Sequence, residues 1–95
     1  MIIRLVHMHF QPDKLNEFFA IFESSKGKIA QFDGCLKLEL LQSTSNPTQL
    51  TTHSIWKSDA HLEKYRESEL FKSTWAKTKV LFSEKANAVS YSIVQ

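Results

Sequence analysis

The sequence predicts an α+β fold whose elements follow the order β-α-β-β-α-β, with a four-stranded antiparallel sheet and all helices on one face. Four stretches have the composition or the alternation of strands, and the segments between the first two and the last two repeat apolar residues at helical spacing. Turn-forming residues separate most of these stretches. The length of 95 residues predicts a single domain over residues 1–95.

Residues 2–10 are rich in β-branched and aromatic side chains, which favour a strand. Alternation gives this strand two faces. One face holds Ile2, Arg4, Val6, Met8 and Phe10, and the other holds Ile3, Leu5, His7 and His9. The first face stays apolar to the end of the strand, so we expect it to join the core.

Residues 12–30 are expected to form the first helix. Pro12 suits the first helical turn, and Asp13 is favourable beside the positive end of the helix. Large apolar residues recur at helical spacing, which predicts one buried stripe. That stripe consists of Leu15, Phe18, Phe19, Phe22 and Ile29. Gly34 follows the helix and can adopt the backbone angles that other residues avoid.

Residues 35–42 and 50–57 are expected to form a β-hairpin. Residues 43–49 between them contain Asn46-Pro47 and have turn chemistry. The first strand alternates in the manner of a half-buried strand. Its two sets are Leu36, Leu38 and Leu40 against Cys35, Lys37 and Glu39.

Two short helices are predicted after the hairpin, each beginning at a serine. Ser58 caps a helix that turns Leu62 and Tyr65 inward, and Ser68 caps a second helix. A loop near residues 83–86 and a final strand over residues 89–93 complete the chain. With right-handed crossovers, this order gives a ferredoxin-like sheet in strand order 4-1-3-2.

Composition and charge exclude several classes of protein. Hydrophobic residues make up 42% of the chain, which indicates a globular protein. The net charge is only +2 and basic residues alternate with acidic ones, so we expect no nucleic-acid partner. One cysteine allows no internal disulfide, and no apolar run is long enough to cross a membrane. We therefore expect a cytoplasmic protein with no membrane partner.

The sheet face turned away from the helices is expected to form a homodimer interface. It holds His7, His9, His53, Lys37, Glu39, Ser90 and Ser92 together with Ile3, Leu5, Leu41, Ile55 and Val94. Such a mixed surface is typical of an interface between subunits. Protonated histidines would repel one another, so we expect the dimer to weaken toward about pH 5. No metal site is expected, because no carboxylate or cysteine is placed to complete a ligand set.

Large side chains from the strands and helices could wall one cavity between the two layers. The predicted pocket residues are Met8, Phe18, Phe22, Ser54, Trp56, Phe71 and Trp75, with Tyr65 beside them. The same aromatic residues could instead fill a solid core. Tyr65 and His61 are the two candidate catalytic residues, although His61 could also face solvent on its helix.

Four motifs stand at the junctions between the predicted elements. They are Pro12-Asp13-Lys14 at the first helix, Phe32-Asp33-Gly34 before the second strand, Trp56-Lys57-Ser58-Asp59-Ala60-His61-Leu62 after the third strand, and the segment from Tyr65 to Phe71 with Ser68. Together with the order of elements, these motifs resemble the antibiotic biosynthesis monooxygenase domain of the dimeric α+β barrel superfamily. The resemblance covers nearly the whole chain and implies a homodimer.

Proteins of this family include cofactor-independent oxygenases of anthrones and quinols, haem-degrading monooxygenases and an isomerase of a phosphorylated quorum-sensing sugar. The haem-degrading branch is characterised by an Asn on the first strand, then a Trp and a His on the helices. The matching positions here hold Val6 or His7, then Tyr65 and Trp75, so the resemblance does not extend to haem degradation. Quinol-oxidising and sugar-isomerising relatives often carry His at the positions of Tyr65 and Leu70.

The resemblance and the aromatic residues together predict a monooxygenase that acts on a small aromatic or quinol substrate without a cofactor. Such an enzyme needs a substrate whose deprotonated form reduces oxygen, and the protein supplies a base and a water-poor cavity. With only two glycines, the chain offers no glycine-rich loop for a cofactor phosphate. Two alternatives stay open: a dimeric module that binds a small ligand without catalysis, and an isomerase of a small carbonyl compound.

Overall fold

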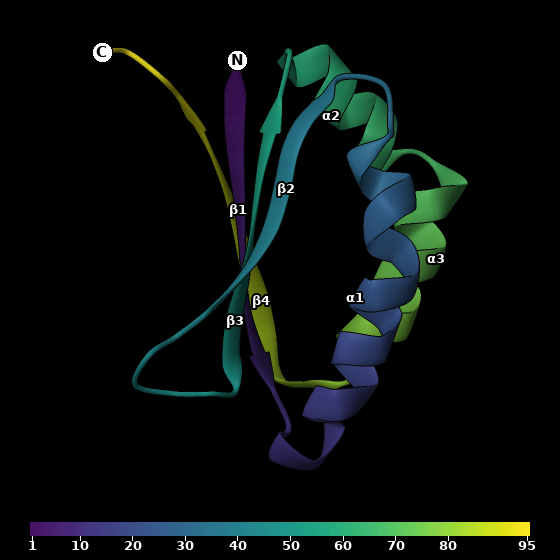
Figure 1. Cartoon of the computed structure of the whole chain (residues 1–95), viewed down its shortest axis with the longest axis vertical. Coiled ribbons are helices and arrows are strands. Elements are labelled where there is room, and N and C mark those ends of the chain that lie inside the picture. Colours follow the sequence, from purple (N-terminus) through teal and green to yellow (C-terminus); the bar gives the residue numbers. More distant parts are fainter.

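The computed structural model describes residues 1–95 as two layers, a four-stranded antiparallel sheet and a layer of helices (Figure 1). The strand order β2-β3-β1-β4 confirms the predicted ferredoxin-like topology. The sheet is open, β2 and β4 are its edges, and the helices cover one face only. The elements are β1 (Ile2–Phe10), η1 (Pro12–Lys14), α1 (Leu15–Ala30), β2 (Cys35–Gln42), β3 (Gln49–Trp56), α2 (Asp59–Arg66), α3 (Glu69–Lys79) and β4 (Phe82–Ser92).

Two serines define the starts of the short helices, as the sequence predicts. The Ser58 hydroxyl accepts a hydrogen bond from the backbone N–H of His61, and the Ser68 hydroxyl accepts one from Phe71. Ser68 also donates its hydroxyl to the carbonyl of Tyr65 in the helix before it. α2 and α3 are therefore two helices that meet at a break, and no helix of the chain has the length and apolar character to span a membrane.

β4 begins earlier than the sequence predicts. The loop expected near residues 83–86 is wrong, because the strand already starts at Phe82. Polar residues such as Ser83 and Glu84 have weak strand propensity, but β1 offers their backbone groups hydrogen-bond partners. Irregular register between His7 and Phe10 of β1 accommodates this polar edge strand.

The two faces of β4 are the reverse of those expected. Ser90 pairs with Arg4 of β1 and accepts a hydrogen bond from its guanidinium at 3.0 Å, so this serine lies on the helix side of the sheet. Ser92, two residues further along, falls on the same side. Val89 and Tyr91 lie on the open face instead. The pairing register with β1, and not the hydropathy of β4, sets the orientation of these side chains.

A second irregularity lies at the start of β2. Pairing with β3 shifts between Cys35 and Lys37, so Leu36 is the extra residue of a bulge. Leu36 is 48% exposed, which corrects the inward position that alternation predicts. Leu38 and Leu40 keep the predicted orientation, because Leu38 contacts the space below the helices and Leu40 packs on the core.

The solid part of the core lies near the end of β1 and the start of β4. The rings of Phe10 and Phe18 stack there with their centroids 4.3 Å apart. The buried cluster consists of Met8, Phe10, Phe18, Leu50 and Leu81. It holds α1 and the chain before β4 against the sheet. Beyond this cluster the side chains leave space between the two layers, and that space is the candidate site.

Candidate functional site

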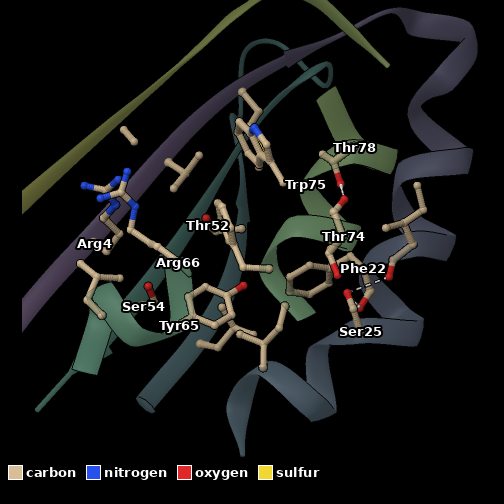
Figure 2. Close-up of a pocket in the computed structure, with 18 of the residues that line it drawn as sticks. Arg4, Phe22, Ser25, Thr52, Ser54, Tyr65, Arg66, Thr74, Trp75 and Thr78 are labelled. Atoms are coloured by element: carbon tan, nitrogen blue, oxygen red, sulfur yellow. Dashed lines mark hydrogen bonds between the residues drawn. The ribbon is translucent and has the colours of Figure 1, made fainter. Parts of the chain in front are cut away.

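The inner face of the sheet forms the floor of a cavity of about 300 Å³ between the sheet and the helices (Figure 2). Side chains alternate along a strand, so every second residue of β1 and β3 points toward the helices. The floor residues are Arg4, Val6 and Met8 on β1 and Thr52, Ser54 and Trp56 on β3, with Leu38 and Ala88 from the edge strands. The volume lies at the lower end of the range for small-molecule sites.

The helices supply the walls of the cavity. Their lining residues recur at helical spacing, so each helix turns one stripe toward the sheet. α1 contributes Phe18, Ile21, Phe22, Ser25 and Ile29, α2 contributes Leu62, Tyr65 and Arg66, and α3 contributes Phe71, Thr74, Trp75 and Thr78. The structure thus brings together every pocket residue predicted from the sequence, and the space between them is not filled solid.

Aromatic rings form a continuous chain along one side of the cavity. Trp56 and Tyr65 stack with their ring centroids 4.9 Å apart, and Phe71 and Trp75 stack with theirs 5.9 Å apart. Tyr65 meets Phe71 edge to face at 5.3 Å, which joins the two stacks. Faces and edges of this kind attract another aromatic ring. The cavity is therefore suited to a flat aromatic ligand.

Tyr65 brings a free phenolic hydroxyl to the cavity. Its backbone carbonyl accepts hydrogen bonds at the α2–α3 break, whereas its phenolic oxygen has no protein partner and points into the cavity (Figure 2). Burial raises the pKa of the Tyr65 phenol above its usual value of 10, and the nearby Cys35 adds to this shift. The phenol is therefore protonated at neutral pH, where it can donate a hydrogen bond but cannot act as a base.

Several other polar side chains of the lining already have partners within the protein. Ser54 accepts a hydrogen bond from the indole N–H of Trp56 at 3.0 Å. Ser25 and Thr78 each donate a hydroxyl to a backbone carbonyl one helical turn back, at 2.8 Å. The hydroxyls of Thr52 and Thr74 also belong to the lining, and they make no hydrogen bond within the protein.

Two arginines lie side by side at one end of the cavity, Arg4 from β1 and Arg66 from the end of α2 (Figure 2). Arg4 donates to the Ser90 hydroxyl at 3.0 Å, and Arg66 donates to the Glu63 carboxylate at 3.2 Å. Partial burial lowers the pKa of Arg4, and the neighbouring charge of Arg66 lowers it further. Arginine starts from so high a pKa that Arg4 remains cationic at neutral pH.

The sequence motifs did not indicate these arginines, although a signal was present. Arg4 is the one charge on the apolar face of its strand, and Arg66 follows Leu62 by four residues, which places both on one side of α2. Val6 faces the cavity from β1, whereas His7 does not line it. The other lining residues that the sequence did not assign to the pocket are Val6, Ile21, Ser25, Ile29, Leu38, Thr52, Leu62, Thr74, Thr78 and Ala88.

His61 does not line the cavity. Its Nδ1 lies 2.7 Å from the Ser58 hydroxyl, and its Nε2 lies 3.9 Å from the Asp33 carboxylate. Its side chain packs directly over Gly34. His61 therefore connects the start of α2 to the loop before β2, and this geometry lends no support to a role as the catalytic base. No histidine, aspartate or glutamate is among the lining residues.

The other three histidines lie on the open face of the sheet, each with its own partner. His53 Nδ1 lies 2.8 Å from the Glu39 carboxylate, and His9 Nδ1 lies 3.3 Å from the Glu84 carboxylate. His7 shares a hydrogen bond of 3.0 Å with a threonine hydroxyl of β3. No group of three or more His, Cys, Asp or Glu side chains is close enough to hold a metal ion.

Comparisons with solved structures identify similar folds. A conserved protein from Methanosarcina mazei Go1 superposes with a TM-score of 0.90 at 24% identity, covering 96% of this chain and 91% of that one. An antibiotic biosynthesis monooxygenase superposes with a TM-score of 0.93 at 16% identity over 100% of both chains. Rv0793 from Mycobacterium tuberculosis superposes with a TM-score of 0.91 at 16% identity, covering 99% of this chain and 95% of that one.

These likenesses have low sequence identity and show the shared fold. None of the curated proteins compared with the chain matches it. The family comparison is more specific, because the model of the antibiotic biosynthesis monooxygenase family matches residues 1–77. With its fold, its motifs and most of its length in agreement, this chain belongs to the antibiotic biosynthesis monooxygenase family.

Proposed function

We propose that this protein is a monooxygenase that oxidises a small aromatic or quinol-like substrate in its cavity and that works without a cofactor. One observation carries the proposal: the free hydroxyl of Tyr65 points into an aromatic-walled cavity of about 300 Å³. The stacked rings around Tyr65 support a flat substrate. Membership of a monooxygenase family supports oxygen chemistry.

In the proposed reaction, the protein positions the substrate and stabilises the negative charge that develops on oxygen. A deprotonated, electron-rich substrate transfers one electron to dioxygen, and the two radicals combine to form a carbon–oxygen bond. The peroxide takes back the proton and then loses water. A CH₂ carbon is thereby oxidised to a carbonyl, one oxygen atom enters the product, and the other is reduced to water. The apolar walls exclude bulk water from these intermediates.

Tyr65 acts in this scheme as a hydrogen-bond donor. Because burial keeps the phenol protonated, its hydroxyl stabilises negative charge on an oxygen of the substrate or of the peroxide. No histidine or carboxylate lines the cavity to remove the first substrate proton. We infer that this proton leaves to solvent and that the two arginines favour the anion that remains.

Oxygen consumption tests the proposal directly. Wild-type protein should accelerate oxygen uptake by reduced naphthoquinones or anthrones above the rate of spontaneous oxidation. Tyr65→Phe keeps the ring stack and should lower this rate by about a hundredfold or more. Tyr91→Phe is the matched control, because Tyr91 is the only other tyrosine and is 53% exposed on the open face. No uptake by wild type across the panel, or full activity of Tyr65→Phe, would refute the proposal.

The second candidate is a dimeric module that binds a small aromatic ligand without turnover. The missing base favours it, since a pure binding site needs none. Ligands that raise the melting temperature without any oxygen uptake or chemical change would establish this alternative. An isomerase of a carbonyl compound needs a base to move a proton between carbons, and the absence of His, Asp and Glu from the lining counts against that alternative.

We further propose that two copies of the chain associate through their open sheet faces. The helices cover only one side of the sheet (Figure 1), and the other side carries partly exposed apolar residues. Leu41 and Tyr91 are 45% and 53% exposed there, next to the half-buried Leu5. Burial of such a face against a second copy would enlarge the small core of each subunit.

A further inference from the structure

We propose that Arg4 and Arg66 together bind the carboxylate of an aromatic acid, so that the substrate or ligand of this cavity is an anionic aromatic compound. The proposal names the substrate class of the cavity described above, and it rests on that cavity being the ligand site. The aromatic walls would hold the ring, and the paired guanidinium groups would hold the acid group at one end.

The choice of basic residues supports this role. The chain has twelve basic residues, and only two of them are arginine. Both arginines line the cavity, whereas no lysine does. A guanidinium presents a planar fork of N–H donors that matches the two oxygens of a carboxylate, which an ammonium group cannot do. Arginine is thus found only where its geometry would serve recognition of a planar anion.

The charges at this end of the cavity do not balance. Arg66 is bonded to the Glu63 carboxylate at 3.2 Å, but Arg4 has only the neutral Ser90 hydroxyl as a partner. Like charges near each other repel, and partial burial makes the charge of Arg4 more costly. The depressed pKa of Arg4 reflects both effects, which the Glu63 carboxylate offsets only in part. An incoming anion would neutralise the excess positive charge and relieve this repulsion.

The two arginines come from the two opposite layers of the cavity. Arg4 lies on the floor and Arg66 on the wall, and their guanidinium groups lie next to each other at the edge of the cavity (Figure 2). Most of the remaining lining is aromatic or aliphatic, and its polar members, among them Thr52 and Thr74, carry only neutral hydroxyls. A ligand that fits this distribution has an apolar ring and one anionic substituent. An uncharged ring would leave the arginines unused, and a small inorganic anion would leave the rings unused.

Calorimetric titration with matched ligands tests the proposal. Hydroxynaphthoic acid and naphthol differ by one carboxyl group, and gentisic acid and hydroquinone form a smaller pair of the same kind. Wild-type protein should bind each acid at least about tenfold more tightly than its neutral partner, and added salt should weaken only the acids. Arg4→Gln and Arg66→Gln should each remove most of this preference while affinity for naphthol stays the same.

Two further variants distinguish binding of the carboxylate by the guanidinium fork from attraction to a positive charge alone. Lys64→Gln removes a positive charge from α2 at an exposed position outside the cavity, and it should keep the preference for the acids. Arg66→Lys keeps the charge but loses the fork, and it should bind the acid more weakly than wild type. Circular dichroism confirms folding of each variant. Arg66→Lys with wild-type affinity for the acid would overturn the pairing geometry that we propose.

The binding readout is independent of turnover. Equal affinity for acid and neutral ligands in wild type, or no binding of either acid, overturns the arginine subsite whatever the oxygen electrode shows. An equal loss of both ligands in the arginine variants also overturns it, because the arginines would then only shape the cavity. Preferential binding of the acids without oxygen uptake keeps the subsite and rejects the monooxygenase reaction.

Discussion

Gly34 and His61 form a contact that leaves no room for a larger residue. Gly34 has a φ of 88°, in the region that favours glycine, and the His61 side chain lies where a Cβ would have to stand. The same histidine reaches Ser58 on one side and Asp33 on the other. This small cluster fixes the loop before β2 against α2, the helix that carries Tyr65.

Gly34→Ala should therefore destabilise the protein by about 1–3 kcal/mol, through backbone strain and displacement of His61. Gly27→Ala is the matched control, because Gly27 lies inside α1 with open space around its Cα. That variant should stabilise the protein by about 0.5–1 kcal/mol through helix propensity. Denaturant unfolding measures both changes, and destabilisation of equal size in the two variants would contradict this account.

The buried phenol of Tyr65 predicts a loss of stability at alkaline pH. The folded protein holds this proton more tightly than the unfolded chain, so the contribution of Tyr65 is complete below pH 10 and is lost as pH rises above it. The slope should reach up to about 1.4 kcal/mol per pH unit. Tyr65→Phe should lack this component in denaturant titrations across the same range. Parallel pH profiles for the two proteins would show that the phenol ionises freely in the folded state.

At this scale the sequence predicted apolar lining residues and missed charged ones. Met8, Ser54 and Trp56 lie on the same strand faces as residues that are clearly internal. The two-residue repeat of a strand is therefore enough to predict that they face the helices. Arg4 obeys the same alternation and falls on the face expected to join the core, but a single charge on that face does not by itself indicate a ligand site. Whether a charge inside a pattern faces solvent or a ligand depends on how neighbouring elements pack, which the pattern does not contain.

Because the chain breaks between α2 and α3, each of these two helices turns its own stripe of side chains toward the same cavity. Ser68 caps the start of α3, and its hydroxyl also donates a hydrogen bond to the Tyr65 carbonyl near the end of α2. One side chain therefore stabilises both the end of α2 and the start of α3. Tyr65 and Phe71 meet edge to face across this break. A single straight helix over the same residues would not reproduce this contact geometry.

Ser68→Ala should destabilise the protein by about 1 kcal/mol, because the Phe71 N–H loses its capping partner. Ser68→Asp restores an acceptor and should recover most of the loss. Ser73→Ala is the control on the exposed surface of α3 and should change stability by less than about 0.5 kcal/mol. Chemical denaturation with circular dichroism separates these cases. A Ser68→Ala variant as stable as Ser73→Ala would mean that the cap is unimportant.

Caps and strands differ in how far local sequence determines them. Ser58 and Ser68 act on residues three positions away, so the sequence predicts them without knowledge of the fold. The bulge at Leu36 and the early start of β4 depend on the register of a partner strand. Neither feature follows from local propensity, because the decisive hydrogen bonds come from residues distant in sequence.

On the scale of the whole molecule, the bare sheet face predicts a dimer. Leu5 lies at the centre of this face on β1, and Leu5→Lys should convert a wild-type dimer to a monomer by placing charges in the interface. Val80→Lys introduces the same charge at a 67% exposed aliphatic residue just after α3, and it should leave the dimer intact. Sedimentation equilibrium gives the result. A monomeric wild type, or a dimeric Leu5→Lys, rejects this interface.

The partners of the histidines on the open face indicate which of them should make the proposed dimer sensitive to acid. His9 and His53 each lie within 3.3 Å of a carboxylate, so the charge they gain on protonation is matched locally. His7 has only a threonine hydroxyl as its partner. Weakening toward acidic pH should therefore depend mainly on His7, and His7→Gln should remove most of it. Sedimentation at acidic and neutral pH checks this, and an unchanged pH response in His7→Gln would contradict it.

The topology of the whole chain was predictable because it rests on element order and on general rules of chain connection. The cavity was harder to predict from the sequence. The same aromatic residues are compatible with a filled core or a hollow one, and only the packed positions of Trp56, Tyr65 and Trp75 show that the space between the layers stays open. Volume balance between layers is a property of the assembled molecule and not of any segment.

One consequence of the aromatic chain is practical. Trp56 and Trp75 are the only tryptophans of the protein, and both line the cavity, one stacked on Tyr65 and the other on Phe71. Indole emission responds to the polarity and the ring contacts of its surroundings. The tryptophan fluorescence of this protein therefore comes only from residues that line the cavity. A shift or quenching of that emission provides a label-free optical screen for compounds that enter it.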